Sequence, residues 1–217
     1  MDNTQNRFFA KTFFWMFLGL LGTALISWYT YTSGLCIELA TSGGFAVVAI
    51  IELIAVLVFS FLFRKLSPTV VGILYFIYAF LNGVSLSSIF VIYDITSIGF
   101  IFLITAALFG ILAFIGYKTE KDLSNWSTIL FPTLLVGIIA SIINLFIGNT
   151  ILDIGITWVT LILFFGITIY DMNKLKMLSE DESLNKDKLY IYGAMQLYLD
   201  FINIFLKLLR IFGKSRD

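Results

Sequence analysis

The chain alternates between long apolar runs and short polar breaks, and this pattern predicts seven membrane-spanning helices. Each run is close to the ~20 residues that a helix needs to cross the hydrocarbon core of a bilayer. No polar stretch reads as a separate soluble domain, so we expect a single transmembrane domain over residues 1–217. The predicted spans are 11–31, 45–63, 70–92, 98–117, 128–148, 152–172 and 189–211.

Composition supports an all-α integral membrane protein. Hydrophobic residues make up 59% of the chain and charged residues 13%, about half the usual share for a soluble domain. The formal net charge is zero, which gives no reason to expect nucleic acid as a partner. The chain has no histidine and one cysteine, Cys36, so it lacks the usual pH switch, the usual zinc ligands and an intrachain disulfide.

Positive charge is sorted by loop. The loops on the opposite side carry Glu38, Asp94 and Asp153 and neither Lys nor Arg. The positive-inside rule therefore places the N-terminus in the cytoplasm. The basic residues that fall on this one side are Arg7, Lys11, Arg64, Lys65, Lys118, Lys121, Lys174, Lys176, Lys186 and Lys188.

The last span carries a polar stripe on one helical face, because its polar positions are separated by three or four residues. Such a stripe cannot face lipid and must face other helices or a water-filled path. We expect Gln196, Asn203 and Lys207 to line such a path; the alternative is a hydrogen-bonded packing seam. The stripe comprises Gly193, Gln196, Asp200, Asn203, Lys207 and Arg210.

Two carboxylates lie where an apolar chain rarely keeps them. Asp200 is in the middle of the last span, and Asp171 ends the span before it, where it is either a site residue or a solvated helix end. A charge at a helix centre costs roughly 2.5–3.5 kcal/mol on insertion scales. If Asp171 and Asp200 meet, they share one proton at low dielectric and titrate toward neutral pH. Deprotonated, they repel each other and offer oxygen ligands to a hard cation such as Ca²⁺.

Three further charges are candidates for the same path. Glu52 lies mid-span and needs a partner or a proton, and we expect Arg210 to pair with it as a second gate. Arg64, at the cytoplasmic end of the second span, either stabilises the closed state or one ionised carboxylate of the aspartate pair, or reaches to lipid headgroups.

The C-terminal motifs resemble the Bax inhibitor-1 family, also called transmembrane Bax inhibitor motif proteins. The resemblance implies a seven-helix bundle whose C-terminal helix is central and wrapped by the other six, and a pH-sensitive calcium leak. It implies that Asp171 and Asp200 are the pH sensor, Arg64 the latch, and Glu52 and Arg210 a further functional pair. The motifs are Tyr-Asp-Met-Asn at 170–173, Leu-Tyr-Leu-Asp-Phe-Ile-Asn-Ile-Phe at 197–205 and Leu-Leu-Arg-Ile-Phe-Gly at 208–213.

The leading functional hypothesis is therefore a proton-gated Ca²⁺ leak channel in the cytoplasmic membrane of a bacterium, with no cofactor. The alternatives are a regulatory protein that binds a membrane protease or a cell-death partner, and a cation–proton antiporter. We expect no enzymatic activity: the sequence has no phosphate-binding Gly-x-x-x-x-Gly-Lys-Ser/Thr loop, and neither aspartate lies in a Gly-x-Gly-Asp element.

Overall fold

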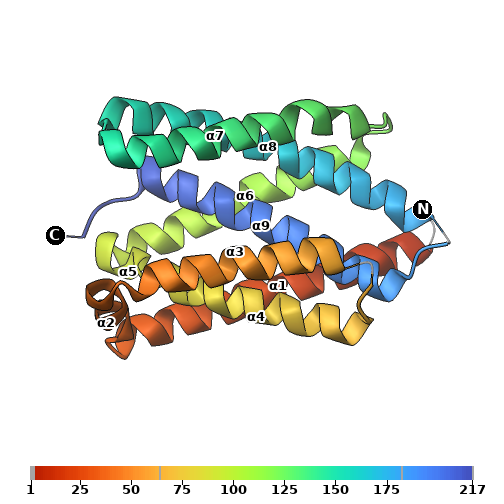
Figure 1. The fold of residues 1–217 in the computed structure, drawn as a ribbon. Helices are drawn as coiled ribbons and strands as arrows, with labels where there is room; N and C mark the ends of the chain where they lie inside the picture. The colour runs from red at the N-terminus through yellow and green to blue at the C-terminus, as the bar shows by residue number, and fades with distance from the viewer. Residues whose placement is uncertain (1–2, 64, 182, 217) are drawn as a thin grey trace. The chain divides into compact units, whose positions relative to one another are not determined.

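The computed structural model describes residues 3–63, 65–181 and 183–216, and the regular structure of these residues is helical (Figure 1). Seven stretches within it are long and apolar enough to cross a membrane, which confirms the predicted fold class. The helices are α1 (Asn3–Thr32), α2 (Leu35–Ser42), α3 (Gly44–Leu62), α4 (Pro68–Leu86), α5 (Ile89–Ile92), α6 (Ile95–Lys118), the 3₁₀ helix η1 (Ser124–Trp126), α7 (Ser127–Ile147), α8 (Thr150–Glu180) and α9 (Lys186–Phe212).

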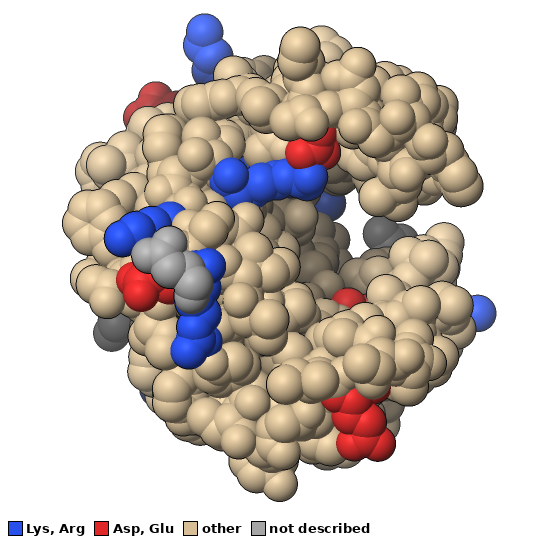
Figure 2. Space-filling view, turned by 90° about the vertical axis from the view of Figure 1, so that its left-hand side faces the viewer, with Lys and Arg blue, Asp and Glu red and all other residues tan. Residues whose placement is uncertain are grey.

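Uncharged side chains dominate the molecular surface at the end where the chain terminates. Figure 2 shows lysine, arginine and acidic side chains there as separate small groups among uncharged atoms. Many large apolar residues of the predicted spans are exposed, such as Phe61 on α3 and Phe146 on α7. In water such a surface would be unstable, so these faces fit contact with lipid tails.

The chain falls into two compact units. The first comprises residues 1–95, 181–198 and 215–217, and the second comprises 96–180 and 199–214. In the first unit α4 packs against both α1 and α3. Helix α4 begins at Pro68 because Ser67 caps it, accepting a hydrogen bond of 3.4 Å from the backbone N–H of Val70.

In the second unit α7 and α8 lie side by side, as Figure 1 shows. They are joined by a tight turn at Gly148, whose φ of 68° is in the left-handed region that glycine adopts without strain. Helix α6 approaches α8 closely at Gly116, where a Cβ atom would lie against the carbonyl oxygen of Ile169 and 2.9 Å from Cβ of Met172.

The last helix, α9, belongs to both units: Lys186–Tyr198 to the first and Leu199–Phe212 to the second. It is the most buried of the seven spans. In its most apolar stretch of 18 residues 67% of the residues are buried, against 6–44% in the corresponding stretches of the other spans. The last helix is therefore the span that is covered most by protein.

Helices α1 and α8 extend beyond the predicted spans, and α2 forms between two of them. Helix α8 continues to Glu180, although the sequence analysis ended this span at residue 172. The extension is stabilised by packing, because Leu175 and Ser179 are buried at helical spacing beyond the apolar run. Helix α2 lies within the predicted loop 32–44, flanked by Gly34 and Gly43, whose φ angles of 83° and 74° end one helix and begin the next.

Candidate functional site

Asp171 and Asp200 come together in the second unit. Asp171 is on α8, Asp200 is on the second half of α9, and each is only 3% exposed. The two carboxyls are close enough to interact electrostatically, and the hydroxyl of Thr168, one turn before Asp171, is a hydrogen-bond partner of Asp200. The structure therefore brings together the two carboxylates that the sequence singled out.

Each member of this pair keeps an unsatisfied oxygen. Oδ1 of Asp171 and Oδ2 of Asp200 accept no hydrogen bond from any residue that the structure describes. A buried polar atom without a partner costs about 1–3 kcal/mol, and more if the group is charged. A shared proton or a bound cation removes this cost, because either one gives the orphaned oxygens a partner.

A lysine side chain lies beside the aspartate pair. Lys174, one turn after Asp171, interacts electrostatically with it, and its ammonium lies 5.7 Å from the ring centroid of Tyr170. This role was not predicted from the sequence, although the spacing of three residues between Asp171 and Lys174 places both on one helical face. Arg64, the predicted latch, lies outside the described residues.

The aspartate pair is surrounded by apolar packing. Next to Asp200, the ring of Phe201 contacts Phe102 and Phe109 of α6 edge-on, at centroid distances of 5.2 and 5.6 Å. Next to Asp171, the ring of Tyr170 meets Phe131 of α7 at 5.9 Å. These contacts exclude water from the two carboxyls, so electrostatic interactions between them are stronger than in water.

A second polar cluster forms within the first unit around Tyr198. Its hydroxyl shares a hydrogen bond of 2.6 Å with the hydroxyl of Thr23 and lies 3.0 Å from Oδ1 of Asn82. Thr23 in turn donates to the carbonyl of Ala79 at 2.9 Å. Asn82 is also a hydrogen-bond partner of Glu52, as is Ser85, so hydrogen bonds link α1, α3, α4 and α9.

Glu52 thus has partners that the sequence analysis did not assign to it. Its carboxylate is held by two side chains of α4, but its Oε1 atom accepts no hydrogen bond within the described part of the chain. The role of Tyr198 was not predicted either, because a tyrosine fits an apolar helix whether or not its hydroxyl is bonded. Its hydroxyl is buried completely.

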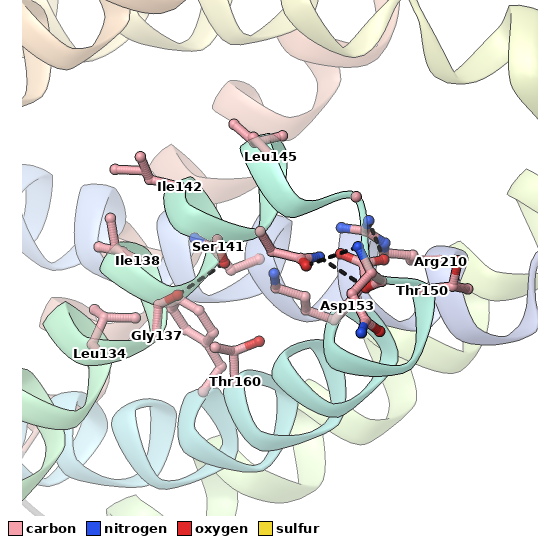
Figure 3. Close-up of a pocket in the computed structure, with 16 residues that line it drawn as sticks. Leu134, Gly137, Ile138, Ser141, Ile142, Leu145, Thr150, Asp153, Thr160 and Arg210 are labelled. Atoms are coloured by element: carbon pink, nitrogen blue, oxygen red, sulfur yellow. Dashed lines mark hydrogen bonds and ion pairs between the residues drawn. The ribbon is translucent and has the colours of Figure 1, made fainter.

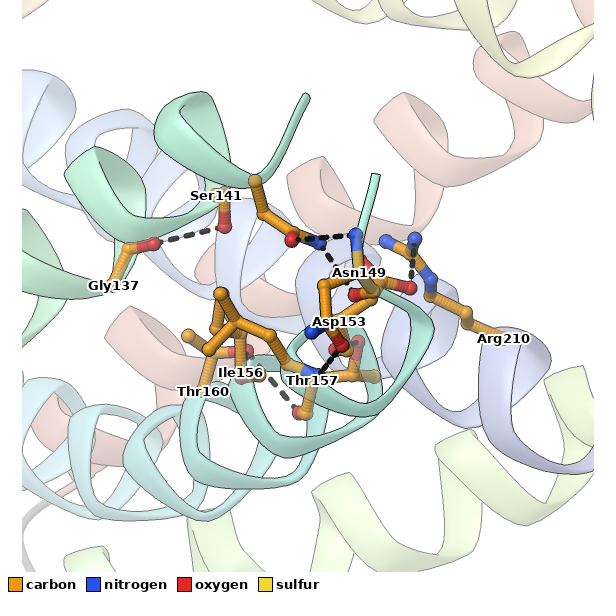
Figure 4. Close-up of polar contacts among 10 residues, drawn as sticks. Gly137, Ser141, Asn149, Asp153, Ile156, Thr157, Thr160 and Arg210 are labelled. Atoms are coloured by element: carbon orange, nitrogen blue, oxygen red, sulfur yellow. Dashed lines mark hydrogen bonds and ion pairs between the residues drawn. The ribbon is translucent and has the colours of Figure 1, made fainter. Parts of the chain in front are cut away.

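Arg210 has a partner that was not predicted from the sequence. Its guanidinium forms an ion pair with Asp153, in the first turn of α8, where the sequence analysis expected Glu52 (Figure 4). The reason is that the last turn of α9 reaches the first turn of α8 within the second unit, and this brings an acidic residue next to Arg210. A pair between Arg210 and Glu52 stays a prediction, since Glu52 belongs to the other unit.

A cavity of about 670 Å³ opens in the second unit between α7, α8 and α9 (Figure 3). Two residues of the predicted polar path, Asn203 and Lys207, line it together with Arg210. Gln196, the third, is half-buried in the first unit. Asn203 donates to the carbonyl of Leu199 at 2.8 Å, which ties its amide to its own helix.

The loop between α6 and α7 is anchored by a residue that the sequence analysis did not single out. The side-chain amide of Asn173 donates to the carbonyls of Thr119 and Lys121 at 2.9 and 3.2 Å, and its oxygen accepts from the N–H of Leu123 at 3.2 Å. Asn173 follows Asp171 by two residues, so this motif combines a carboxylate with a loop anchor.

Comparison with known proteins supports the resemblance over the whole chain. The family model described as inhibitor of apoptosis-promoting Bax1 matches residues 5–217. The chain is 39% identical over 215 residues to the inner membrane protein YbhL of Escherichia coli, covering 96% of this chain and 92% of that protein. It is 36% identical to an uncharacterized protein of Borreliella burgdorferi (98% and 94% covered) and to one of Deinococcus radiodurans (97% and 91% covered).

Three observations point to the same family. The chain has seven helices able to span a membrane, the last two of them carry a buried carboxylate pair, and the family model matches nearly all residues. The chain belongs to the Bax inhibitor-1 family.

Proposed function

We propose that this protein is a pH-sensitive calcium leak channel, in which Asp171 and Asp200 form the gate. The observation that carries the proposal is the pair of buried carboxyl oxygens, Oδ1 of Asp171 and Oδ2 of Asp200, that accept no hydrogen bond from the described residues. Such a pair is unstable without a proton or a cation, so both ligands of the proposed gate follow from the same geometry.

The proposed closed state holds one proton between the two carboxyls. The proton lets one carboxyl donate to the other, which bridges α8 and α9 and satisfies the orphaned oxygens. Loss of the proton leaves two like charges in contact at low dielectric, and their repulsion separates the helices. Flux should therefore rise as the pH rises.

The open pair is suited to passage rather than storage of Ca²⁺. A tight calcium site needs about six to eight oxygen ligands, and the aspartates supply two carboxylates. Conduction requires that an ion bind well enough to enter and weakly enough to leave. We therefore propose Ca²⁺ and protons as the ligands of this site, with no resident cofactor and no chemical reaction.

We place the protein in the cytoplasmic membrane of a bacterium, with a cytoplasmic N-terminus. The similar protein of E. coli is named an inner membrane protein, and seven helices of this chain are able to cross a membrane. The sorting of Lys and Arg into one set of loops supports the orientation.

The test is Ca²⁺ uptake by proteoliposomes across a pH series, for the native protein and for Asp171→Asn and Asp200→Asn. Native flux should climb with pH by up to about tenfold per pH unit on the titrating limb, because one proton controls the gate. Either variant should lose this dependence, since an amide neither shares the proton nor repels its partner.

The matched control is Asp187→Asn, a carboxylate on the same helix whose side chain is 64% exposed. It should keep the native pH profile. A folded native protein without flux above empty liposomes would refute the channel, and a pH profile unchanged in both site variants would refute the gate.

A further inference from the structure

The cavity between α7, α8 and α9 has one long apolar wall. Its residues on α7 recur every three or four positions and so form one stripe of that helix. From Leu134 to Leu145 the stripe extends about 16 Å along the helix axis, close to the ~15 Å depth of one leaflet. The members of the stripe, all labelled in Figure 3, are Leu134, Gly137, Ile138, Ser141, Ile142 and Leu145.

Two hydroxyl groups on the cavity walls, those of Ser141 and Thr160, donate to carbonyls of their own helices. Ser141 donates to the carbonyl of Gly137 at 2.8 Å, and Thr160 donates to that of Ile156 at 2.7 Å (Figure 4). These bonds leave the middle of the cavity effectively apolar, because the protons that could bind a polar ligand are already donated.

The amide groups at the polar end are engaged as well. Asn144 donates to the carbonyl of Asn149 at 3.1 Å and accepts from its N–H at 3.2 Å, which closes the turn between α7 and α8. Arg210 is held by Asp153. The turn and the ion pair thus fix the position of Asn144 and Arg210 at the polar end of the cavity.

Lys207 is a charged residue of the cavity lining that forms no ion pair with a described residue. No described residue accepts a hydrogen bond from its ammonium or lies within ion-pair distance, although Asp153 and Arg210 interact with it electrostatically. The charged lining residues are Asp153, Lys207 and Arg210, one anion and two cations, which leaves a net charge of +1. A half-buried, unpaired ammonium favours an anion beside it.

We propose that this cavity binds one acidic phospholipid from the leaflet at the α7–α8 turn. The phosphate pairs with Lys207 at the polar end, and an acyl chain lies along the α7 stripe toward the bilayer centre. The charge selects an anion, and the leaflet-length apolar wall selects a lipid over a soluble anion, which would leave that wall unfilled.

The binding test uses native mass spectrometry of the detergent-purified protein titrated with phosphatidylglycerol and, separately, with phosphatidylcholine of identical chains. Phosphatidylglycerol should bind more tightly. Lys207→Gln should weaken its binding about fivefold, the effect of removing one favourable basic group near a lipid headgroup. Lys214→Gln, the same change just beyond α9 and outside the cavity, should leave binding as it was.

A second pair of variants tests the acyl chain. Ile138→Trp fills the cavity and should lower binding of both lipids, whereas Ile139→Trp, on a neighbouring face of α7, should not; both isoleucines are 48% exposed. Helix content by circular dichroism and elution on gel filtration show that each variant is folded.

Three results would overturn the proposal: equal affinity for the two lipids, equal loss in Lys207→Gln and Lys214→Gln, or full displacement of the lipid by millimolar inorganic phosphate. The readout is lipid binding and not Ca²⁺ flux, so this site and the aspartate gate succeed or fail independently.

Discussion

Tyr198 is the residue on which the polar interior of the first unit depends. It is completely buried, and its hydroxyl contacts Asn82 on α4 and Thr23 on α1. Tyr198→Phe keeps the ring and removes this hydroxyl, which leaves two buried groups short of a partner. We expect a loss of about 1–3 kcal/mol in the free energy of unfolding.

Denaturant unfolding in detergent, followed by circular dichroism, measures this loss. The matched control is Tyr29→Phe. Tyr29 is 63% exposed, so loss of its hydroxyl should leave the free energy of unfolding unchanged. If both variants unfold at the same denaturant concentration, the hydroxyl network does not stabilise the unit.

For single residues, the sequence was sufficient to identify the buried carboxylates but not the residues that they contact. Asp171, Asp200 and Glu52 could be identified because an ionisable group in an apolar run is unusual. Tyr198 could not, since a tyrosine fits an apolar helix whether or not its hydroxyl is used. The pairing of Arg210 with Asp153 depends on which helix ends meet, and this contact is not encoded in local spacing.

Among the helices, the contact between α6 and α8 sets how closely the Asp171 helix is held. Gly116 permits it, because a Cβ there would lie against the carbonyl oxygen of Ile169. Gly116→Ala should therefore destabilise the protein by about 1–3 kcal/mol, since backbone atoms must move apart.

Gly110→Ala is the control on the same helix, where nothing lies within 4 Å of the added atom. It should be neutral or stabilising by up to about 1 kcal/mol, because alanine favours a helix over glycine. Thermal unfolding of both variants in the same detergent separates the clash from helix propensity. Equal midpoints would mean that α6 and α8 do not need the glycine.

Hydropathy predicted which segments form the spanning helices, but it did not predict where each helix ends. The seven apolar runs correspond to the seven spanning helices because a bilayer demands that length. The extension of α8 to Glu180 was missed, because the packing of Leu175 and the anchoring of the α6–α7 loop by Asn173 outweigh the polar composition of that segment.

For the molecule as a whole, titration near neutral pH has few possible sources. The chain has no histidine. Outside the spans, hydrogen bonds from the hydroxyl and backbone N–H of Ser124 lower the pKa of Asp122, and those of Ser183 lower the pKa of Asp181. A lowered pKa means that both carboxylates remain ionised from neutral pH down past their ordinary range.

Asp122→Asn and Asp181→Asn should consequently leave the pH midpoint of Ca²⁺ flux unchanged, while Asp200→Asn abolishes the dependence. The pH series in proteoliposomes measures all three. A midpoint displaced by either loop variant would place the sensor in the loops rather than between the helices.

The division of α9 between the two units has a thermodynamic consequence. Tyr198 is the last residue of α9 that belongs to the first unit. Asp200 follows two positions later, in the part of α9 that belongs to the second unit, after about 3 Å of helical rise. If protonation of Asp200 shifts the helix enough to alter the hydrogen bonds of Tyr198, then linkage is reciprocal, and altering those bonds must change the proton affinity of Asp200 by the same free energy. A Tyr198→Phe protein would then gate at a different pH, although the substitution adds no charge and removes none.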